Sequence, residues 1–268
     1  MAGVMRWTDR KVAQFWDANA AGWSKVVDAR ADIFREAFNN PEFFRFAGNL
    51  KGLRILDAGC GEGRNTRLFA LRGARMTGVD LSRKLIARAR KAEREEPLGI
   101  VYREASFSRM PMLRSASFDG VVSTVALMDG PDFKGALREL FRVLKPGGPL
   151  SFSITHPCFE MPKLGWRKED GQVMLAISDY FNRRTWVERW PDDISVPRFP
   201  RTLSWYLNAI IATGFLLEKL EEPRPSEAAC RRHPKLRKWR DHAACYLYVR
   251  ARKPDPAITA TTGTWESG

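Results

Sequence analysis

A glycine-rich turn at residues 57–63 most constrains the fold of this chain. The turn reads DAGCGEG, follows an apolar run and precedes a helix-like pattern. Glycines at alternate positions let a backbone turn sharply from a strand into a helix and approach a ligand where a side chain would collide. Asp80 ends a second apolar run, residues 75–79, where a strand would present its carboxylate to two ribose hydroxyls. Together the two segments predict a cradle for a nucleotide-containing cofactor.

The spacing of these glycines departs from the fingerprint of dinucleotide-binding folds. That fingerprint is G-x-G-x-x-G, and counting from Gly59 its last position falls on Arg64. The third glycine, Gly63, comes one residue early, and Asp57 stands two residues before the first glycine. With no pyrophosphate to hold, such a loop would face a smaller ligand whose amino group pairs with a carboxylate. This arrangement suits S-adenosylmethionine.

Four segments in a fixed order carry a family resemblance. They are DAGCGEG at residues 57–63, GVDLS at 78–82, SFDGVVS at 117–123 and LFRVLKPGG at 140–148. The set resembles the class I S-adenosylmethionine-dependent methyltransferases, in particular the small-molecule enzymes with a methyltransferase type 11 domain. The likeness covers roughly residues 50 to 155 and extends more loosely to the C-terminal strands. A lone glycine loop is often only a structural turn, whereas the ordered set is much more specific.

The resemblance implies S-adenosyl-L-methionine as the cofactor and assigns its contacts. In the family, the acidic residue and the glycine backbones of the loop hold the methionine part, and the second acidic residue binds the ribose. A further acidic residue often precedes a Leu-Pro pair and accepts a hydrogen bond from the adenine. Here Ser106 precedes Met110-Pro111, and a neutral hydroxyl is a weaker acceptor than a carboxylate. The positions carried over are Asp57, Gly59, Gly61, Gly63, Asp80, Leu81, Ser106 and Phe107.

Composition sets the class of protein. With 268 residues, of which 44% are hydrophobic, the chain can bury one substantial core as a single domain with an insertion. No apolar signal-peptide region follows the first residues and no apolar run is long enough to span a bilayer, so we expect a cytoplasmic protein. The four cysteines form no C-x-x-C pair and no cluster, which favours free thiols and predicts no metal site.

A positive charge leaves nucleic acid open as a partner. The chain has 45 basic and 31 acidic residues, and this balance of +14 would attract nucleic acid or anionic substrates. The densest basic run, residues 231–240, contains Trp239, which could stack on a base. The alternative is a solvated loop before the last strand. We favour the loop because Pro234 interrupts a continuous basic helix and no known RNA-binding motif surrounds the run.

Alternating strand-like and helix-like segments predict the fold. Short apolar runs typical of parallel strands lie at residues 53–57, 75–79, 100–103, 120–124 and 150–155. Helical patterns lie at 65–71, after the capping residue Ser82, and at 133–144 after Asp132. The alternation specifies an α/β doubly wound, mostly parallel Rossmann-like sheet with helices on both faces, whose ligands bind beyond the carboxyl ends of the strands. The resemblance adds a last, antiparallel strand at 244–251.

Five regions are expected along the chain. They are an N-terminal helical lid at 1–50, the S-adenosylmethionine-binding core at 51–155, a substrate-binding insertion at 156–200, the C-terminal part of the core sheet at 201–253, and a disordered tail at 254–268. Many aromatic residues of the lid must simply pack in the core, but Trp16, Asn19 and Trp23 are candidates to close over the ligands. In the insertion, aromatic residues alternate with proline and charged residues, which suits a pocket wall. Tyr180 and Trp186 are therefore candidate substrate contacts.

Two residues are candidates for proton transfer. His156 follows a predicted core strand at its carboxyl end, and histidine accepts a proton near neutral pH. The alternative is a histidine whose ring only hydrogen-bonds the backbone or lines the pocket. Asp129 is the second candidate, although the segment 129–132 also fits an ordinary loop and helix cap.

The sequence therefore predicts a methyltransferase that transfers a methyl group from S-adenosyl-L-methionine to a small organic acceptor. An in-line displacement from a sulfonium needs mainly the alignment of donor and acceptor, so the chain identifies the donor better than the acceptor. One alternative is a tRNA-modifying methyltransferase that uses the basic surface. Another is a cofactor-binding regulator without transfer activity, which the serine at position 106 leaves open.

Overall fold

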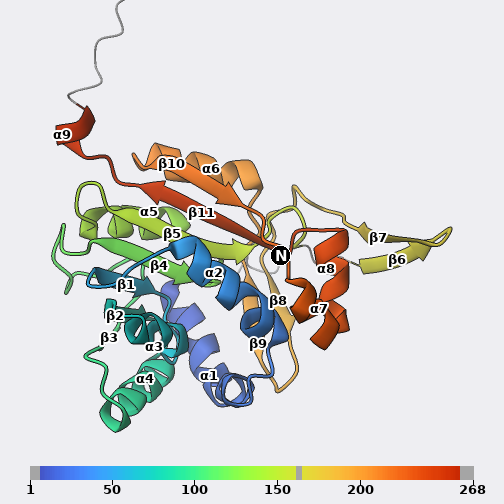
Figure 1. Cartoon of the computed structure of the whole chain (residues 1–268), viewed down its shortest axis with the longest axis horizontal. Helices are drawn as coiled ribbons and strands as arrows, with labels where there is room; N and C mark the ends of the chain where they lie inside the picture. The colour runs from blue at the N-terminus through green and yellow to red at the C-terminus, as the bar shows by residue number, and fades with distance from the viewer. Residues whose placement is uncertain (1–6, 161–164, 260–268) are drawn as a thin grey trace, which may run out of the picture.

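Seven strands form one central sheet in the computed structural model, which describes residues 7–160 and 165–259 (Figure 1). Their order across the sheet is β10-β11-β5-β4-β1-β2-β3. The strands are β1 (Arg54–Ala58), β2 (Arg75–Asp80), β3 (Val101–Glu104), β4 (Gly120–Thr124), β5 (Pro149–Thr155), β10 (Leu216–Glu221) and β11 (Tyr246–Arg252). Neighbours from β3 to β5 pair parallel, whereas β11 is antiparallel to both β5 and β10. The doubly wound sheet and its antiparallel last strand are confirmed.

Helices cover both faces of the sheet because successive strand residues point to opposite sides. In β1, Ile55 and Leu56 are both fully buried but belong to two different hydrophobic clusters. One cluster contains residues of α5 (Phe133–Val143) and α6 (Leu203–Ala212). The other contains residues of α2 (Asn40–Ala47), α3 (Arg64–Leu71) and α4 (Arg83–Glu95). A strand buried on both faces reads as a continuous apolar run, as the sequence does here.

Side-chain caps set where the predicted helices begin. Ser82 Oγ accepts a hydrogen bond from Leu85 N at 3.2 Å and starts α4. Asp132 Oδ1 accepts one from Gly135 N at 2.8 Å and starts α5. Each cap satisfies an N–H group that has no partner within its own helix. Both caps were expected from the sequence, and the two helices begin at the predicted residues.

The N-terminal segment consists of α1 (Asp9–Asp28), a short π-helix η1 (Arg35–Asn39) and α2. Helix α1 packs against α4 and the hairpin strand β9 (Ser195–Arg198). Asp17 Oδ1 accepts hydrogen bonds from Ser82 Oγ at 2.7 Å and from Lys84 N at 3.0 Å. Because the first N–H groups of a helix carry partial positive charge, a carboxylate there is stabilising. These bonds fix α1 against the start of α4, beside the carboxyl ends of the strands.

The expected insertion folds into two hairpins instead of an irregular wall. They are β6 (Gly165–Glu169) with β7 (Gln172–Ala176), and β8 (Trp186–Arg189) with β9. Asn19 joins the second hairpin to α1, since its amide donates to Ser195 O at 2.8 Å and accepts from Ser195 N at 3.0 Å. The lid and the insertion therefore contact each other directly. Residues 161–164 of the insertion lie outside the described part of the chain.

The basic run at 231–240 is helical, and the expectation of a solvated loop is wrong. It consists of the end of α7 (Glu227–Arg232), a 3-10 turn at Pro234–Leu236 and the first residues of α8 (Arg237–Asp241). Leu236 is fully buried, and the Trp239 ring lies edge-on to Trp166, with 5.2 Å between ring centroids. The Trp239 ring is also edge-on to the Phe34 ring, with 6.5 Å between ring centroids. The tryptophan therefore packs against Trp166 of the first hairpin and Phe34 of the N-terminal segment.

The chain ends differ in part from expectation. Residues 256–259, inside the expected disordered tail at 254–268, form the short helix α9 (Pro256–Thr259), and residues 260–268 lie outside the described part.

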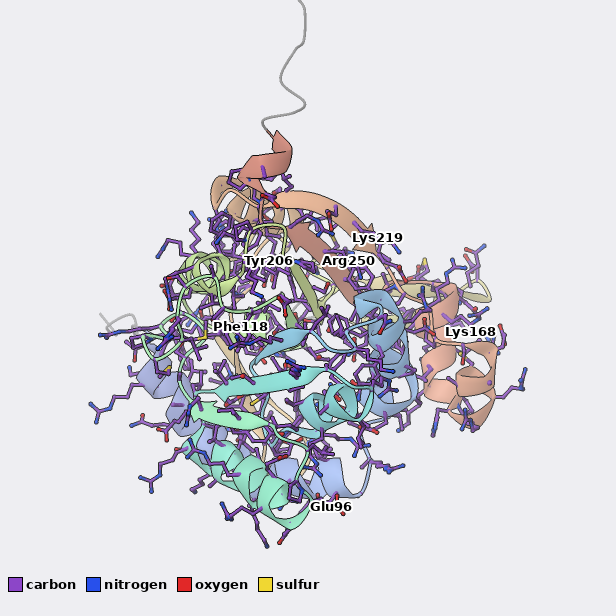
Figure 2. All side chains as sticks on the ribbon, turned by 60° about the vertical axis from the view of Figure 1, so that its left-hand side comes forward. Glu96, Phe118, Lys168, Tyr206, Lys219 and Arg250 are labelled. Atoms are coloured by element: carbon purple, nitrogen blue, oxygen red, sulfur yellow. The ribbon has the colours of Figure 1, made fainter. Side chains whose placement is uncertain are left out.

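At the edge of the sheet formed by β10, Lys219 of β10 and Arg250 of β11 lie opposite each other (Figure 2). Both cations contact the Phe46 ring of α2, at 5.5 and 5.0 Å from its centroid. Within residues 7–160 and 165–259, no helix has the length and apolar character needed to cross a bilayer.

Candidate active site

The glycine loop takes a backbone path that side chains would obstruct. Gly59, Gly61 and Gly63 have φ values of +81°, +56° and +86°, in the left-handed region that favours glycine. A Cβ atom on Gly59 would lie 2.4 Å from the Cβ of Ala126, and one on Gly63 would lie 2.4 Å from the hydroxyl of Tyr102. Around Gly61 nothing would lie within 4 Å. The loop is thus tightly packed at its ends and open in its middle.

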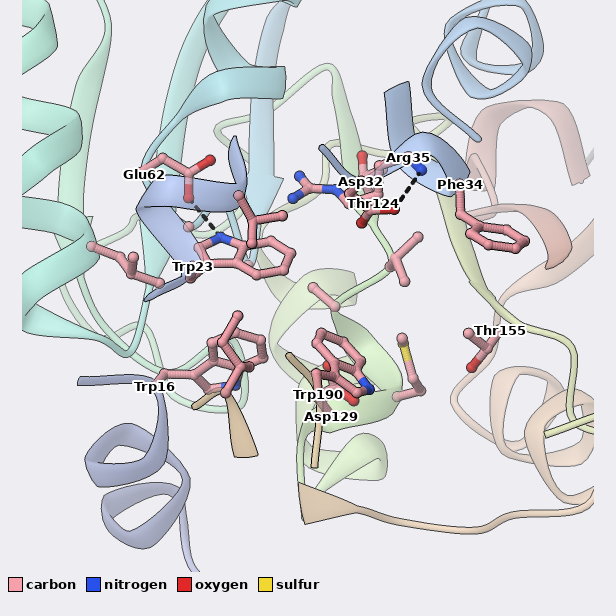
Figure 3. A pocket seen from close by; sticks show the side chains of 18 of the residues that line it. Trp16, Trp23, Asp32, Phe34, Arg35, Glu62, Thr124, Asp129, Thr155 and Trp190 are labelled. Atoms are coloured by element: carbon pink, nitrogen blue, oxygen red, sulfur yellow. Dashed lines mark hydrogen bonds between the residues drawn. The ribbon is translucent and has the colours of Figure 1, made fainter. Parts of the chain in front are cut away.

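A cavity of about 710 Å³ lies beyond the carboxyl ends of β1, β2 and β4, next to this loop (Figure 3). Such a volume is within the range of small-molecule sites. The predicted site residues that line it are Trp16, Trp23, Gly59, Gly61, Asp80, Leu81, Phe107 and Asp129. The predicted residues that are not part of its wall are Asp57, Gly63, Ser106, His156, Tyr180 and Trp186.

Asp80 is held with its carboxylate at the cavity wall. Its Oδ2 accepts a hydrogen bond from Gly61 N at 2.9 Å and its Oδ1 accepts one from Ser82 N at 2.8 Å. Burial raises the pKa of this carboxyl to about 6, and the nearby Glu62 adds to the rise, although the two backbone bonds oppose it. The side chain therefore links the glycine loop to the start of α4 and faces the space where a ligand would lie.

Asp57 lies beneath the loop, not on the cavity wall. Its Oδ2 accepts a hydrogen bond from Thr66 Oγ1 at 2.6 Å, and only 1% of the residue is exposed. Burial raises the pKa of Asp57 to about 7 despite that bond. The contact joins β1 to α3, so Asp57 shapes the loop from below. The expected direct contact with the methionine end of a cofactor does not fit this position.

The expected adenine contacts divide between the cavity wall and the surrounding structure. Phe107 lines the cavity with Leu81, and its ring fills the space beside Gly130, where an added Cβ would lie 2.5 Å from it. Ser106 is turned away from the cavity, since its Oγ lies 2.9 Å from Ser108 Oγ and accepts from Ser108 N at 3.1 Å. Ser108 Oγ in turn donates to Asp9 at 2.7 Å. Ser106 thus helps to seat α1.

Three indoles form an aromatic wall across the cavity. The ring centroids of Trp16 and Trp23 are 5.7 Å apart, and those of Trp23 and Trp190 are 6.3 Å apart. The Trp23 Nε1 donates a hydrogen bond to Glu62 Oε2 at 2.8 Å. The guanidinium of Arg35 lies over the Trp23 ring at 4.8 Å from its centroid. The N-terminal segment, the glycine loop and the second hairpin therefore meet at Trp23 (Figure 3).

A buried ion pair borders the other part of the cavity. Arg198 Nη1 lies 3.3 Å from Asp129 Oδ1 and 3.1 Å from Glu160 Oε1, and its Nε lies 2.7 Å from Glu188 Oε2. The guanidinium also lies over the Trp190 ring, 5.1 Å from its centroid. Burial raises the pKa of Asp129 to about 7, and the attraction of Arg198 reduces the rise. Burial therefore opposes the ionisation of Asp129, and the guanidinium of Arg198 favours it.

His156 is engaged on both ring nitrogens within the protein. Its Nδ1 accepts a hydrogen bond from Cys158 N at 3.2 Å, so Nε2 carries the proton and donates to Glu222 Oε1 at 2.8 Å. Burial lowers the pKa of the imidazole, and Glu222 partly opposes this. The ring is 3% exposed. His156 thus fits the alternative in which it hydrogen-bonds the backbone, and it lies outside the cavity wall.

Tyr180 and Trp186 line a second, small cavity of about 20 Å³. Asp129 and Arg198 belong to the walls of both cavities and separate them. The Tyr180 hydroxyl accepts a hydrogen bond from Leu203 N at 2.9 Å, at the start of α6. The two aromatic residues therefore lie on the far side of the ion pair from the large cavity.

In the ranges 7–160 and 165–259, no group of three or more His, Cys, Asp or Glu side chains is arranged to hold a metal ion.

Several cavity residues escaped the sequence reasoning. Glu62 lies inside the glycine motif, which assigns it no role of its own, and Arg35 lies in a segment whose most prominent residues are aromatic. Arg198 had a visible signal, because it is a lone basic residue in the apolar stretch 194–199. Thr124, at the end of β4, lines the cavity with a fully buried Oγ1 that has no hydrogen-bond partner in the described structure. A buried hydroxyl of this kind points to a ligand that completes the site.

Comparisons with known proteins agree with this geometry. Residues 56–152 match the family described as a methyltransferase domain. A solved S-adenosylmethionine-dependent methyltransferase from Mesorhizobium loti is 33% identical and superposes with a TM-score of 0.69, over 79% of this chain and 96% of that one. The ubiquinone biosynthesis O-methyltransferase of Pseudomonas putida strain F1 is 33% identical over 187 residues, covering 65% of this chain and 81% of the relative.

A third relative matches over a shorter stretch. The malonyl-[acyl-carrier protein] O-methyltransferase of Enterobacter lignolyticus is 37% identical over 119 residues, which are 44% of this chain and 45% of that protein. The chain thus spans about half the length of some of the curated relatives it matches. The family match over residues 56–152 includes the glycine loop and Asp80. By fold, motif order and the likeness to relatives that are 33% identical over most of their own length, this chain belongs to the S-adenosylmethionine-dependent methyltransferases.

Proposed function

We propose that this enzyme methylates a small organic acceptor held between α1 and the second hairpin. The observation that carries the proposal is the single cavity that joins the glycine loop to the Asp129–Arg198 pair. S-adenosyl-L-methionine, the cofactor, supplies a methyl group that is already activated on a sulfonium. The chain's own task is to hold donor and acceptor aligned and dry, which can contribute roughly 7 to 11 kcal/mol to such reactions.

The cofactor side of the cavity is assigned to residues on its wall. Asp80 would accept hydrogen bonds from the ribose hydroxyls, and Leu81 and Phe107 would flank the adenine. The open backbone at Gly61 leaves room for the chain of the cofactor. Gly63 and Asp57 would support the loop from outside the cavity, through Tyr102 and Thr66. The orphan hydroxyl of Thr124 supports the presence of a ligand at the junction of β1 and β4.

Asp129 is the proton acceptor that the geometry favours. An acceptor hydroxyl or amine must lose a proton during transfer, and a base works best with a pKa near the working pH. The pKa of Asp129, about 7, meets that condition, and its carboxyl lies on the wall shared with Trp190 and Arg198. We assign His156 a structural role, because it anchors the 156–158 turn to Glu222. Tyr180 and Trp186 would then shape the acceptor site from behind Arg198.

The acceptor class can be tested directly. The enzyme is incubated with methyl-labelled cofactor and either a metabolite extract or tRNA, and products are searched by mass spectrometry for one labelled methyl group. We expect label in small molecules. Transfer to tRNA that exceeds transfer to small molecules, with binding that falls steeply with salt, would contradict the proposal and support the tRNA alternative. The packing of Trp239 against Trp166 and Phe34 argues against base stacking at the basic run.

The role of Asp129 has its own test once an acceptor is found. In Asp129→Asn the neutral amide cannot take a proton, so we expect kcat to fall about 100-fold or more and to lose its rise through pH 7. The affinity for cofactor should change much less than kcat, because Asp129 is not one of the assigned ribose and adenine contacts. A variant that keeps both kcat and its pH profile would remove Asp129 as the base.

The roles of the N-terminal segment and the insertion, and the cellular location, are also proposals. We propose that residues 7–50 act as a lid and that residues 156–200 supply the acceptor side, because the two segments meet over the cavity. A cytoplasmic location is supported by four cysteines that are free, since disulfides are rare in reducing compartments.

A further inference from the structure

Trp23 contacts one acidic and one basic side chain of the cavity wall. Its Nε1–H donates to Glu62 Oε2 at 2.8 Å, and the guanidinium of Arg35 lies over its ring at 4.8 Å from the centroid (Figure 3). Glu62 belongs to the glycine loop, Arg35 begins the π-helix, and Trp23 comes from α1. One indole thus brings opposite charges from distant parts of the chain to one place in the cavity.

Both charged groups retain unused capacity for a ligand. Only 7% of Glu62 is exposed, and within the described residues its sole hydrogen bond is the one from Trp23. In the ranges 7–160 and 165–259 the Arg35 guanidinium has no ion pair within 4.0 Å, although its charge acts on the buried Asp57 carboxyl and lowers the pKa of that group. Its contact with the indole face fixes its position without using its donors. A carboxylate and a guanidinium held in this way match a ligand group that carries one positive and one negative charge.

Asp57 does not reach the cavity, so another carboxylate must bind the ammonium group of the cofactor. The family pattern gives the acidic residue before the first glycine to the methionine part of the cofactor, but here that residue lies under the loop and bonds Thr66. Glu62 is the carboxylate of the same loop that reaches the cavity. It lies close enough to Asp80 to raise the pKa of that carboxyl, so it is near the assigned ribose site.

We propose that Glu62 and Arg35 bind the ammonium and carboxylate groups of the cofactor's amino-acid end, and that Trp23 is the positioning residue that holds both. The ligand class is a zwitterionic α-amino acid joined to an adenosyl thioether or sulfonium. The inference needs only the cofactor and is independent of which acceptor is methylated.

Two ligands separate this inference from general effects on the site. S-adenosylhomocysteine carries the amino-acid end, whereas 5′-methylthioadenosine has the same adenosine and sulfur without it. Calorimetry should show that the unaltered enzyme prefers S-adenosylhomocysteine. In Glu62→Gln and in Arg35→Gln, we expect affinity for S-adenosylhomocysteine to fall at least about tenfold, and affinity for 5′-methylthioadenosine to change by less than about threefold.

Two further variants complete the design. Glu95→Gln removes an exposed carboxylate at the end of α4, outside the cavity wall, and should leave both affinities unchanged. Trp23→Phe keeps a ring but removes the Nε1–H, and should weaken only S-adenosylhomocysteine. The double variant with Glu62→Gln should bind no more weakly than Glu62→Gln alone, because both changes remove one interaction.

Two results would overturn the inference. One is unchanged affinity for S-adenosylhomocysteine in both glutamine variants. The other is an equal loss for both ligands, which would show that these residues only support the fold of the loop. Circular dichroism and thermal unfolding of each variant identify any that fail to fold. Acceptor methylation takes no part in these measurements, so a failure here is distinct from a failure of the proposed acceptor class.

Discussion

Replacing Asp80 with asparagine should weaken cofactor binding without removing the side chain. Asp80 accepts backbone hydrogen bonds on both oxygens, from Gly61 N at 2.9 Å and from Ser82 N at 2.8 Å. An asparagine keeps one acceptor and places an amide donor against the other N–H group. A lost hydrogen bond to a charged group costs about 1.5 to 3 kcal/mol. With the ribose contacts also weakened, we expect a loss of about 2 to 4 kcal/mol, or roughly 30- to 1000-fold in Kd.

The pH dependence of binding gives the same prediction a second measurement. The pKa of Asp80 is raised to about 6, and the ionised carboxylate is the form that accepts from two hydroxyls. The unaltered enzyme should therefore bind S-adenosylhomocysteine more tightly as the pH rises through 6, and Asp80→Asn should lack this rise. Calorimetry between pH 5 and 8 in buffers of different ionisation enthalpy measures both the affinity and the proton released. Binding by Asp80→Asn that equals the unaltered enzyme at pH 8 would refute the ribose assignment.

Two other substitutions test the loop and the histidine. Gly63→Ala should lower the free energy of unfolding by about 2 kcal/mol or more, because the left-handed backbone and the Tyr102 hydroxyl, 2.4 Å from the added Cβ atom, both oppose a side chain. Urea unfolding measures this free energy. An unchanged value would show that the loop is not confined. His156→Asn should lose about 1 to 3 kcal/mol of stability but keep the pH profile of methyl transfer, because the ring bonds Glu222 and Cys158 outside the cavity. A changed pH profile would show that His156 takes part in the proton transfer.

Local signals allowed the fold to be predicted closely. Strand β4 was expected at residues 120–124 and is found there, because a strand buried on both faces leaves a continuous apolar run between polar turns. The caps at Ser82 and Asp132 were found for a similar reason, since each acts on a residue three positions away. These features depend on neighbours in the chain, so they are visible without the structure.

The short helices around the basic run could not be found in that way. Helix α8 has 5 residues and α7 has 6, which is too short for a hydrophobic repeat to be recognised. Isolated helices of that length are not stable, and these depend on tertiary contacts such as the buried Leu236. The proline that argued for a loop begins the 3-10 turn between them. The sequence identified the interruption but not the helices on either side.

The candidate site was predicted where it depends on the loop and missed where distant segments meet. The motif places two carboxylates, Asp57 and Glu62, within one turn, but only the folded loop shows which one reaches the cavity. Arg198 and Asp129 are 69 positions apart, so no local pattern joins them. The family motif therefore predicts the loop beside the cavity, while the charges on the rest of the cavity wall depend on how other segments cover it.

The two covering segments form one surface, and this constrains how the acceptor site can change. Asn19 of α1 exchanges two hydrogen bonds with Ser195, and an added Cβ on Gly22 would lie 2.4 Å from the backbone oxygen of Asp192. Trp23 and Trp190 extend the same contact into the cavity. A substitution that moves the second hairpin must therefore also move α1, and with it the indole that contacts Glu62 and Arg35. If the second hairpin holds the acceptor as proposed, acceptor selection and cofactor binding are mechanically linked, although their residues lie far apart in the sequence.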